Sequence, residues 1–489
     1  MPDSQPASPP VRISRDAAIE RVHRHIDASF DHHLEAVRAF LRQPSVSAED
    51  WGMRETAQLV VEMIRACGGT AHLVETRRHP MVYGEIDRGK PRTLLVYGMY
   101  DVQPVNGQDW KVPPFDAAVL DVPGIGDAVV ARGALNSKGP LGCLMMALKA
   151  IKEADDIPCN LIFTIEGEEE IGSPFLPHFY RDNRQKLMQA TAGVDFYFTQ
   201  EANGAVEVGL GAKGMLHLAL TSRGGHWMGP KEDVHSSASP LIASPAWRLV
   251  QALACLKDRH EKILVPGFMD SVVPPSPAEI QLIEKYCARM TRLDFMTRYG
   301  ANAFLDDEPG LPTERLVERL LFHPTLNLAA MTAGEPESRG DKTIIPGEAH
   351  AYLDVRLVAE MEVEETVERI RRHLDEQGYQ DVELTVSEGY SWSKISPREP
   401  IVQTLLDSYR YHGIEPLLIP SMPWSSPYYL FDRLLGLPYV IFGLGHGAGA
   451  HGPNEYCSVA GMKAYEKSVA TFLYHFADQG DLGSPDYQI

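Results

Sequence analysis

Three apolar segments that each border polar residues decide the fold of this chain. They read LLVYGMYD at positions 94–101, ARGALNSKGP at 131–140 and LIFTIEGEEEIGS at 161–173. The first and third are typical of buried strands, and the second opens an apolar helical run that reaches Ile151. A strand, a helix and a further strand predict a parallel βαβ unit. Ligands of such sheets bind beside the carboxyl ends of the strands, so we expect these polar residues to meet at one site.

Further elements extend this unit on both sides. Apolar residues recur at helical spacing over residues 17–42. A buried-strand pattern at 439–442 precedes a glycine-rich segment that ends in HGPNE at 451–455. The other predicted helices of this part are 55–67, 401–411 and 459–476, and the other predicted strands are 81–86 and 195–199.

The middle of the chain differs in character from the rest. The pattern at 215–221 alternates apolar and polar residues, which is typical of a sheet with one solvent-facing side. We predict an inserted α+β domain over 212–391. The remainder forms a predicted catalytic α/β domain, with a mostly parallel sheet flanked by helices, over 15–211 and 392–489. Residues 1–14, rich in proline and serine, form a predicted disordered lead-in.

Composition limits the partners of this chain. Its 489 residues carry a formal net charge of −20, which argues against nucleic acid and anionic membranes as partners. The six cysteines include no CxxC pair, a pattern that favours a reducing compartment. No apolar run reaches the length of a membrane span, and the first residues lack the apolar core of a secretory signal. We therefore expect a cytoplasmic protein that acts on a small molecule.

Short polar motifs stand in a fixed order along the chain. They are GMYDVQP (98–104), RGALNSKG (132–139), EGEEEIGS (166–173), DVHS (233–236), KTIIP (342–346), RLV (356–358) and HGPNE (451–455). With them the chain resembles the M20 metallopeptidase family, in particular its dipeptidase and carnosinase-like branch. The resemblance implies an α/β catalytic domain interrupted by a smaller lid domain that forms a homodimer. It also implies two divalent metals, usually zinc, that share a carboxylate and activate a water, which a glutamate deprotonates.

Three ligand positions of the family carry other residues here. Met99 stands where the family has a histidine, and a thioether is a poor ligand for such metals. Asn136 stands at the bridging aspartate, and a neutral amide lacks the charge needed between two dications. Gln200 stands at an aspartate or glutamate ligand, unless its neighbour Glu201 takes that place. The resemblance therefore implies that the dinuclear centre is lost.

Other family positions are kept. Glu170 and His451 match metal ligands, and Glu169 matches the general base. Asp101 matches the aspartate that orients the missing histidine ligand, so here it is a candidate acid. We expect at most one divalent metal, zinc or manganese, held by Glu170, His451 and the oxygen of Asn136, with a metal-free site as the alternative.

The inserted domain keeps two further matches. His235 matches a histidine that reaches across the dimer to stabilise an oxyanion, and Arg356 matches an arginine that binds a substrate carboxylate. The family's Gly-Gly-Ser turn, expected near 419–423, reads IPSMP instead. The far end of the substrate is therefore expected to be held differently from that of a dipeptidase.

Three functions remain open from the sequence. The first is an amidohydrolase that cleaves an amide or amidine of a small amino-acid-like molecule, with Glu169 as base and Asn136, His235 and Arg356 near the substrate. The second is a metal-independent isomerase, racemase, lyase or hydrolase that moves protons with Glu169, His451, His235 and Asp101. The third is a binding protein without catalysis. Fold alone does not choose among them.

Overall fold

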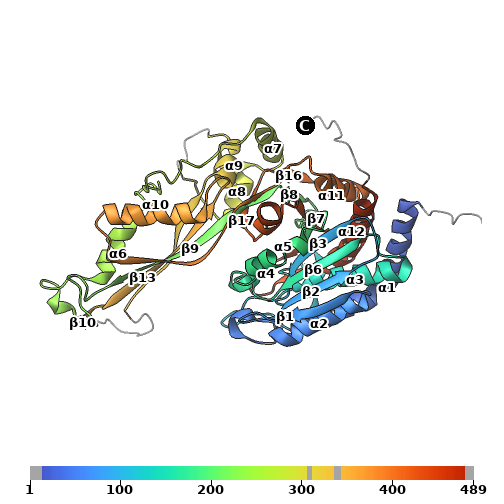
Figure 1. Ribbon diagram of the computed structural model, residues 1–489, viewed down its shortest axis with the longest axis horizontal. Coiled ribbons are helices and arrows are strands. Elements are labelled where there is room, and N and C mark those ends of the chain that lie inside the picture. The colour runs from blue at the N-terminus through green and yellow to red at the C-terminus, as the bar shows by residue number, and fades with distance from the viewer. Residues whose placement is uncertain (1–13, 306–310, 335–342, 480–489) are drawn as a thin grey trace, which may run out of the picture. The chain divides into compact units, whose positions relative to one another are not determined.

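The computed structural model describes residues 14–305, 311–334 and 343–479 (Figure 1). These residues fold into two compact units. The first unit holds the chain up to Val208, the segment Pro397–Pro416 and the chain from Leu434. The second unit holds Gly209–Ser396 and Leu417–Arg433.

A mixed sheet lies at the centre of the first unit. Among the described residues it has six strands, in the spatial order β1 (Thr70–Val74), β2 (Met81–Ile86), β6 (Asn160–Glu166), β3 (Thr93–Met99), β7 (Ala192–Phe196) and β18 (Tyr439–Phe442). Strands β6, β3, β7 and β18 run parallel to one another. Strand β2 pairs antiparallel with both of its neighbours, β1 and β6. The continuous apolar runs of β3 and β6 suit strands that are buried on both faces. The predicted mostly parallel sheet is confirmed.

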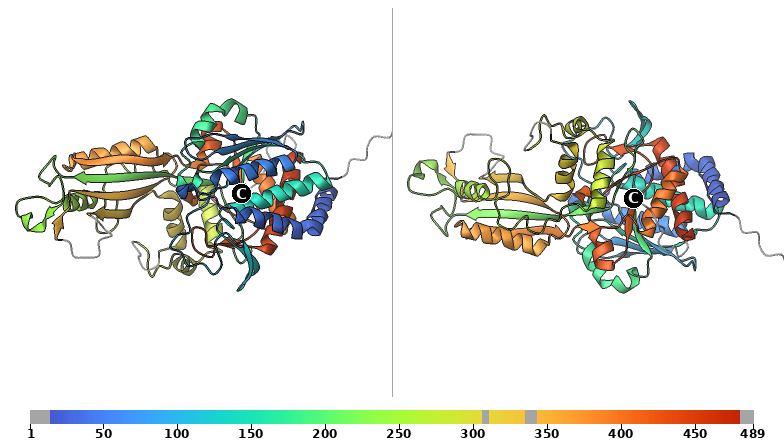
Figure 2. Two further views of the ribbon diagram at one scale, coloured as in Figure 1. Left: turned by 90° about the horizontal axis from the view of Figure 1, so that it is seen from below. Right: turned by 90° about the horizontal axis from the view of Figure 1, so that it is seen from above.

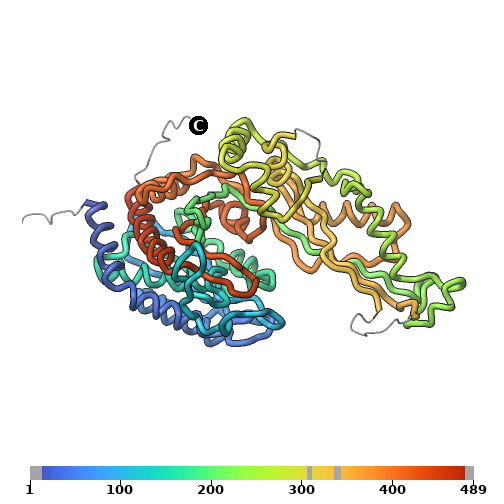
Figure 3. The backbone as a smooth tube through the Cα atoms, turned by 180° about the vertical axis from the view of Figure 1, so that it is seen from behind, coloured from blue at the N-terminus to red at the C-terminus, as the bar shows by residue number. Residues whose placement is uncertain are grey.

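Helices of the first unit form layers against this sheet. They are α1 (Arg15–Arg42), α2 (Met53–Ala66), α3 (Lys138–Ala154), α4 (Leu176–Asp182), α5 (Arg184–Leu187), α11 (Pro400–Tyr411) and α12 (Val459–Asp478), with the short 3-10 turns η1 (Ser47–Glu49) and η2 (Glu169–Ile171). Helices α1, α3 and α12 pack on one another (Figure 3). The Ser14 side chain caps α1, and the rest of the predicted lead-in at 1–14 lies outside the described residues.

Two neighbouring residues of β2 show that helices cover both faces of the sheet. Gly84 faces α2, since a Cβ at this glycine would lie 3.0 Å from Cδ1 of Ile64. Tyr83 points to the opposite face, because side chains alternate along a strand. There its ring packs against Phe179 of α4, with the ring centroids 5.9 Å apart. The β-sheet of the first unit is thus sandwiched between helices.

A smaller antiparallel sheet of the first unit brings distant segments together. Its order is β19 (Gly447–Ala448), β20 (Tyr456–Ser458), β5 (Gly126–Val130) and β4 (Ala118–Val122). Strand β20 directly follows the HGPNE segment, and β5 directly precedes the segment 131–140. Tyr456 pairs with Val130, and the N–H of Ala131 donates to the carbonyl of Glu455 at 3.0 Å. This pairing holds the two polar segments side by side.

An antiparallel sheet dominates the second unit. Its order is β11 (Thr325–Ala333), β13 (Glu348–Leu357), β9 (Gly211–Arg223) and β14 (Val382–Tyr390). Strand β15 (Ser393–Lys394) also pairs antiparallel with β9, and β17 (Met422–Ser425) pairs parallel with it. Helices α6 (Pro245–Ala254) and α10 (Val363–Glu376) pack on one face, and Figure 2 shows α10 along the strands. The alternation in β13 explains this, because Ala351, Leu353 and Val355 enter the core while Tyr352 stays exposed.

The remaining elements of the second unit are short. Three helices, α7 (Pro277–Cys287), α8 (Arg292–Tyr299) and α9 (Thr313–Phe322), share a small apolar cluster that includes Ile283, Phe295 and Val317. In the described part of the chain, no helix is long and apolar enough to cross a membrane. The elements not yet given are β10 (Val234–His235), β12 (Ile344–Ile345), β16 (Leu417–Ile419) and η3 (Ser236–Ala238), together with β8 (Glu207–Gly209) and the π-helical η4 (Leu430–Leu435), each of which includes residues of both units.

Candidate active site

The polar ends of β3 and β6 meet in the first unit. Asp101 follows β3 and is fully buried, with 0% of its surface exposed. Its Oδ1 accepts the N–H of Glu169 at 3.2 Å, and its Oδ2 accepts the N–H of Glu170 at 2.9 Å. One carboxylate therefore fixes the turn that carries two other carboxylates. The expectation that these strand ends converge is confirmed.

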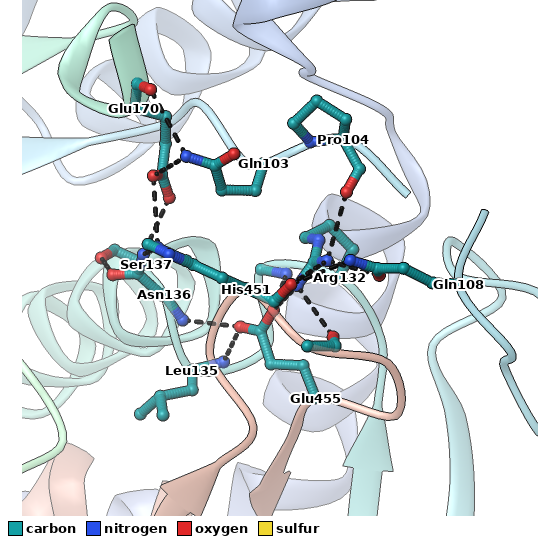
Figure 4. A network of polar contacts seen from close by, with 12 residues as sticks. Gln103, Pro104, Gln108, Arg132, Leu135, Asn136, Ser137, Glu170, His451 and Glu455 are labelled. Atoms are coloured by element: carbon teal, nitrogen blue, oxygen red, sulfur yellow. Dashed lines mark hydrogen bonds and ion pairs between the residues drawn. The ribbon is translucent and has the colours of Figure 1, made fainter. Parts of the chain in front are cut away.

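Glu170 is held by neutral donors (Figure 4). The Asn136 amide nitrogen donates to its Oε1 at 2.8 Å, and the Gln103 amide nitrogen donates to its Oε2 at 2.8 Å. Its side chain is only 4% exposed. Both oxygens of this buried carboxylate are thus satisfied by side-chain amides, as buried polar groups require.

His451 lies at the open side of this network. Its Nε2 is 3.0 Å from the Asn136 amide nitrogen and 3.3 Å from Oε2 of Glu170. The His451 side chain is 57% exposed, whereas that of Glu170 is buried. The hydrogen bond to Glu170 raises the pKa of His451 above its ordinary value. His451 is therefore a titratable group that solvent or substrate can reach.

The orientation of the Asn136 amide follows from its neighbours. Its Oδ1 accepts hydrogen bonds from the Ser137 hydroxyl at 3.0 Å and the Tyr197 hydroxyl at 3.3 Å. Its nitrogen therefore faces Glu170, whose carboxylate is an acceptor, with Nε2 of His451 beside it. The Glu170 carboxylate and the two hydroxyl donors all support the same orientation of the Asn136 side-chain amide.

A buried ion pair fixes the loop that carries Asn136. Glu455 is fully buried, and its carboxylate accepts Nη1 of Arg132 at 2.7 Å. It also accepts backbone N–H groups of the same loop, from Gly133 at 3.1 Å, Leu135 at 2.9 Å and Asn136 at 2.8 Å. The Arg132 side chain is 1% exposed and also donates to the carbonyl of His451 at 3.1 Å. The pair therefore positions both Asn136 and His451.

Several carboxyl groups crowd the base of the site. Burial, together with Glu170, raises the pKa of Asp101 to about 7. Burial and the charge of Asp101 raise the pKa of Glu166 to about 8, although the hydroxyls of Tyr97 and Ser173 donate to its Oε1. Burial, then Glu170 and Asp101, holds the pKa of Glu169 well above its usual range. Groups that exchange protons near neutral pH are suited to acid–base chemistry.

The three glutamates at 168–170 have different contacts: Glu168 supports a neighbouring loop, and Glu169 and Glu170 belong to the site. Glu168 is buried, and its Oε1 accepts the Thr76 hydroxyl at 2.8 Å and the N–H of His79 at 2.8 Å. It thereby ties the turn to a loop before β2. Glu169 and Glu170 are the members that belong to the network of Asp101.

The positions at which we expect lost ligands make contacts that support the fold. Met99 is the last residue of β3 and is buried in register with Glu166 of β6. Gln200 accepts the N–H of Gly445 at 2.8 Å and donates to the carbonyl of Gly204 at 3.2 Å, so its amide holds two loops. The neighbouring Glu201 closes a turn, its N–H donating to the carbonyl of Ala205 at 2.9 Å.

The donor set does not fit a pair of metal ions. Among the described residues, no group of three or more histidine, cysteine, aspartate and glutamate side chains is placed to hold a metal. Around Glu170 stand one histidine and two amide nitrogens, and an N–H donor cannot ligate a cation. A catalytic zinc normally has three protein ligands, whereas Glu170 and His451 supply two.

Two predicted site residues belong to the second unit. His235 lies in β10, with Nδ1 2.8 Å from the Ser237 hydroxyl and Nε2 3.2 Å from that of Thr343. Arg356 lies in β13, with Nε 3.8 Å from Oδ1 of Asp354. The segment expected to replace the family's turn, 419–423, contains the end of β16 and the start of β17. The roles assigned to His235 and Arg356 remain predictions.

Sequence reasoning missed the residues that orient the site. Gln103, Arg132 and Glu455 all stand inside the quoted motifs, but no role was assigned to them. Arg132 and Glu455 form an ion pair across 323 positions of the chain, and the spacing of residues in the sequence does not reveal such a contact. The sequence did offer one indication, because each of the two motifs with a candidate site residue also contains a residue of opposite charge to the other: Arg132 near Asn136, and Glu455 near His451. Tyr197 stands two residues before an expected strand end and gave none.

Comparison with known proteins finds a family model that matches most of the chain. The profile described as peptidase family M20/M25/M40 matches residues 95–475. The Cys-Gly metallodipeptidase dug1 of Schizosaccharomyces pombe is 29% identical over 374 residues, 72% of this chain and 74% of that protein. The Beta-Ala-His dipeptidase of Homo sapiens is 26% identical over 307 residues, 61% of this chain and 56% of that protein. The M20 family metallo-carboxypeptidase of Sulfolobus solfataricus has 30% identity and a TM-score of 0.82, covering 91% of this chain and 99% of that one.

Proposed function

The chain belongs to peptidase family M20/M25/M40, and from this premise we propose that it is a peptidase-type hydrolase of a small amino-acid-like substrate. The bond cleaved is an amide, or an amidine of the same geometry. The names of the relatives specify Cys-Gly and β-Ala-His dipeptides as their substrates. We carry over the class of bond and the small size of the substrate, and leave the side chains of the substrate open.

The arrangement of Glu169 beside Asp101 and Glu170, with His451 at the open side of Glu170, carries this proposal. Hydrolysis of an amide needs a base that takes a proton from water and an acid that returns one to the leaving amine. Glu169, with a pKa above its usual range, serves as the base in its ionised form. His451, largely exposed and with a pKa raised by its contact with Glu170, serves as the donor in its protonated form. The products are a carboxylic acid and an amine.

Neutral and charged donors stabilise the developing oxyanion in this proposal. The Asn136 amide nitrogen lies between Glu170 and His451, at the open side of the network. His235 of a second protomer adds a further donor, as the family resemblance implies, and Arg356 binds a carboxylate of the substrate. A homodimer is therefore part of the proposal, and so is a cytoplasmic location. The free cysteines, of which Cys67, Cys143, Cys159 and Cys457 are buried, agree with a reducing compartment.

The proposed hydrolase binds at most one divalent metal ion per chain. The relatives are named as metallodipeptidases, so divalent ions belong to their chemistry. In this chain Glu170 and His451 are the two candidate ligands, and they hold at most one zinc or manganese ion. An ion bound there would polarise the substrate carbonyl or the attacking water.

Release of amines from a substrate panel tests the proposal. Dipeptides, N-acyl amino acids and carbamoyl or amidino amino acids are incubated with the protein, and mass spectrometry follows the products. We expect turnover of at least one class, and a loss of about 100-fold or more in kcat for Glu169→Gln. Glu62→Gln, at an exposed position of α2, is the matched control. Full activity of Glu169→Gln would remove Glu169 from its assigned role, and no turnover of any class would remove the hydrolase.

The crowded carboxyl groups favour a second candidate. Asp101 and Glu166 have pKa values raised to about 7 and about 8, so both exchange protons near neutral pH. Such a set suits a metal-independent isomerase, racemase or lyase that moves a proton from carbon. Incubation of the same panel in D2O distinguishes the two. Deuterium incorporation at a substrate carbon without release of an amine favours the second candidate.

A further inference from the structure

We infer that the Asn136 amide takes the place of a cation beside Glu170, and that this site works without a divalent metal. The inference rests on the proposed function, since it concerns the same residues, and it narrows the metal content from at most one ion to none. It stands on the chemistry and orientation of the side-chain donors around Glu170.

The first step concerns the oxygens of Glu170. Each is already bonded to an amide N–H at 2.8 Å, from Asn136 and from Gln103. A zinc ion would sit at about 2.0–2.2 Å from a carboxylate oxygen. Each amide N–H takes one of the two lone-pair sites on its oxygen. A metal at Glu170 would have to share the carboxylate with these two donors, and their amide nitrogens could not act as its ligands.

The second step concerns the cost of turning Asn136 over. Its oxygen accepts two hydroxyls, from Ser137 and Tyr197, and its backbone N–H is held by Glu455. A flipped amide would present its oxygen to the Glu170 carboxylate, where two acceptors repel. The surrounding donors and acceptors therefore fix the nitrogen toward Glu170. This orientation makes Asn136 a donor and excludes it as a ligand.

The third step concerns the other carboxyl groups near the site. Asp101 accepts two backbone N–H groups, and Glu166 accepts two hydroxyls on one oxygen. Protein donors thus serve both oxygens of Asp101 and one oxygen of Glu166, whose Oε2 is buried without a hydrogen-bond partner among the described residues. The position that the family fills with a histidine ligand is taken by Met99, which is buried in β3. No second ligand set replaces the lost one in the described residues.

Zinc binding tests the inference directly. Protein without a histidine tag is treated with EDTA, desalted, equilibrated with micromolar zinc and analysed by inductively coupled plasma mass spectrometry. We expect wild-type protein to retain far less than one zinc per chain. The double variant Met99→His/Asn136→Asp restores two family ligands, and we expect it to retain about one zinc or more. Asn203→Asp is the matched control, because this exposed side chain keeps the oxygen that accepts the N–H of Ala205.

Each outcome decides the inference. Stoichiometric zinc in wild-type protein overturns it. A zinc-free wild type whose double variant gains zinc, and whose melting temperature rises with zinc, supports it. If the wild type is zinc-free and the double variant, folded by circular dichroism, also gains none, then Asn136 is not the cause and the inference fails.

The zinc measurement tests this inference separately from the proposed hydrolase, because the amount of bound zinc is measured without any catalytic turnover. A zinc-free protein that releases amines in EDTA supports both. A zinc-free protein without hydrolysis supports the inference alone and removes the hydrolase.

Discussion

Glu170 and Glu455 are two buried carboxylates on either side of Asn136 that are neutralised in different ways. Glu455 faces the guanidinium of Arg132 and three backbone N–H groups. Glu170 faces two neutral amides and a histidine at the surface. Glu455 thus stands opposite a fixed positive charge, whereas Glu170 is compensated by neutral donors and one titratable histidine. The first arrangement builds the frame, and the second leaves the chemistry available.

Removing the charge of Glu455 should have the largest effect on stability. Glu455→Gln leaves Arg132 buried without an anion, so we expect the free energy of unfolding to fall by about 3–5 kcal/mol. Urea denaturation measures this loss. Glu415→Gln is the matched control, because Glu415 pairs with Arg410 at the surface and its removal costs about 1 kcal/mol or less. Equal losses in the two variants would contradict the role of the buried pair.

Lys213 extends the comparison to the second unit. It is a buried cation whose ammonium donates to the carbonyl of His323 at 2.7 Å. Burial, and then Arg356, lowers its pKa to about 8 from the ordinary 10.5. Because the unfolded chain binds this proton more tightly, Lys213 costs stability fully below pH 8, and the cost disappears as the pH rises toward 10.5.

The variant Lys213→Met should remove this dependence on pH. We expect the difference in unfolding free energy between wild type and variant to change by about 2–3 kcal/mol between pH 7.5 and 10, with wild type gaining as pH rises. Chemical denaturation across that range measures it. Lys285→Met, at an exposed position of α7, should show a flat difference. A flat difference for Lys213→Met as well would show that its charge is compensated.

Glu170→Gln should have the smallest effect on stability. Its partners are neutral, so we expect a loss of about 1–3 kcal/mol, less than for Glu455→Gln. The same change removes the group that raises the pKa of His451, so that pKa should fall. Proton NMR titration of His451 measures this shift, and Glu62→Gln should leave it in place. An unchanged titration would separate His451 from Glu170.

The fold was largely predictable because its main strands are apolar runs. The runs that became β3, β6 and β18 are long enough to signal buried strands, and the parallel sheet follows from their alternation with helices. The pairs β4–β5 and β19–β20 were not predicted. They are short and partly exposed, and β4 alternates without a clearly apolar face.

The candidate site was predictable in its members and not in its orientation. Asp101, Asn136, Glu170 and His451 come together as their motifs imply. The direction of the Asn136 amide depends on the hydroxyls of Ser137 and Tyr197 and on the loop held by Glu455. These contacts arise from tertiary packing, which no local pattern encodes.

The bond between Arg132 and Glu455 also sets when the site can exist during synthesis of the chain. The two residues are 323 positions apart, and the whole second unit is translated between them. Strand β18, which pairs with β7, is likewise made late. At about 5–20 residues per second, the ribosome needs on the order of tens of seconds to supply these missing pieces. During that interval the nascent chain carries an open edge at β7 and an Arg132 without its anion.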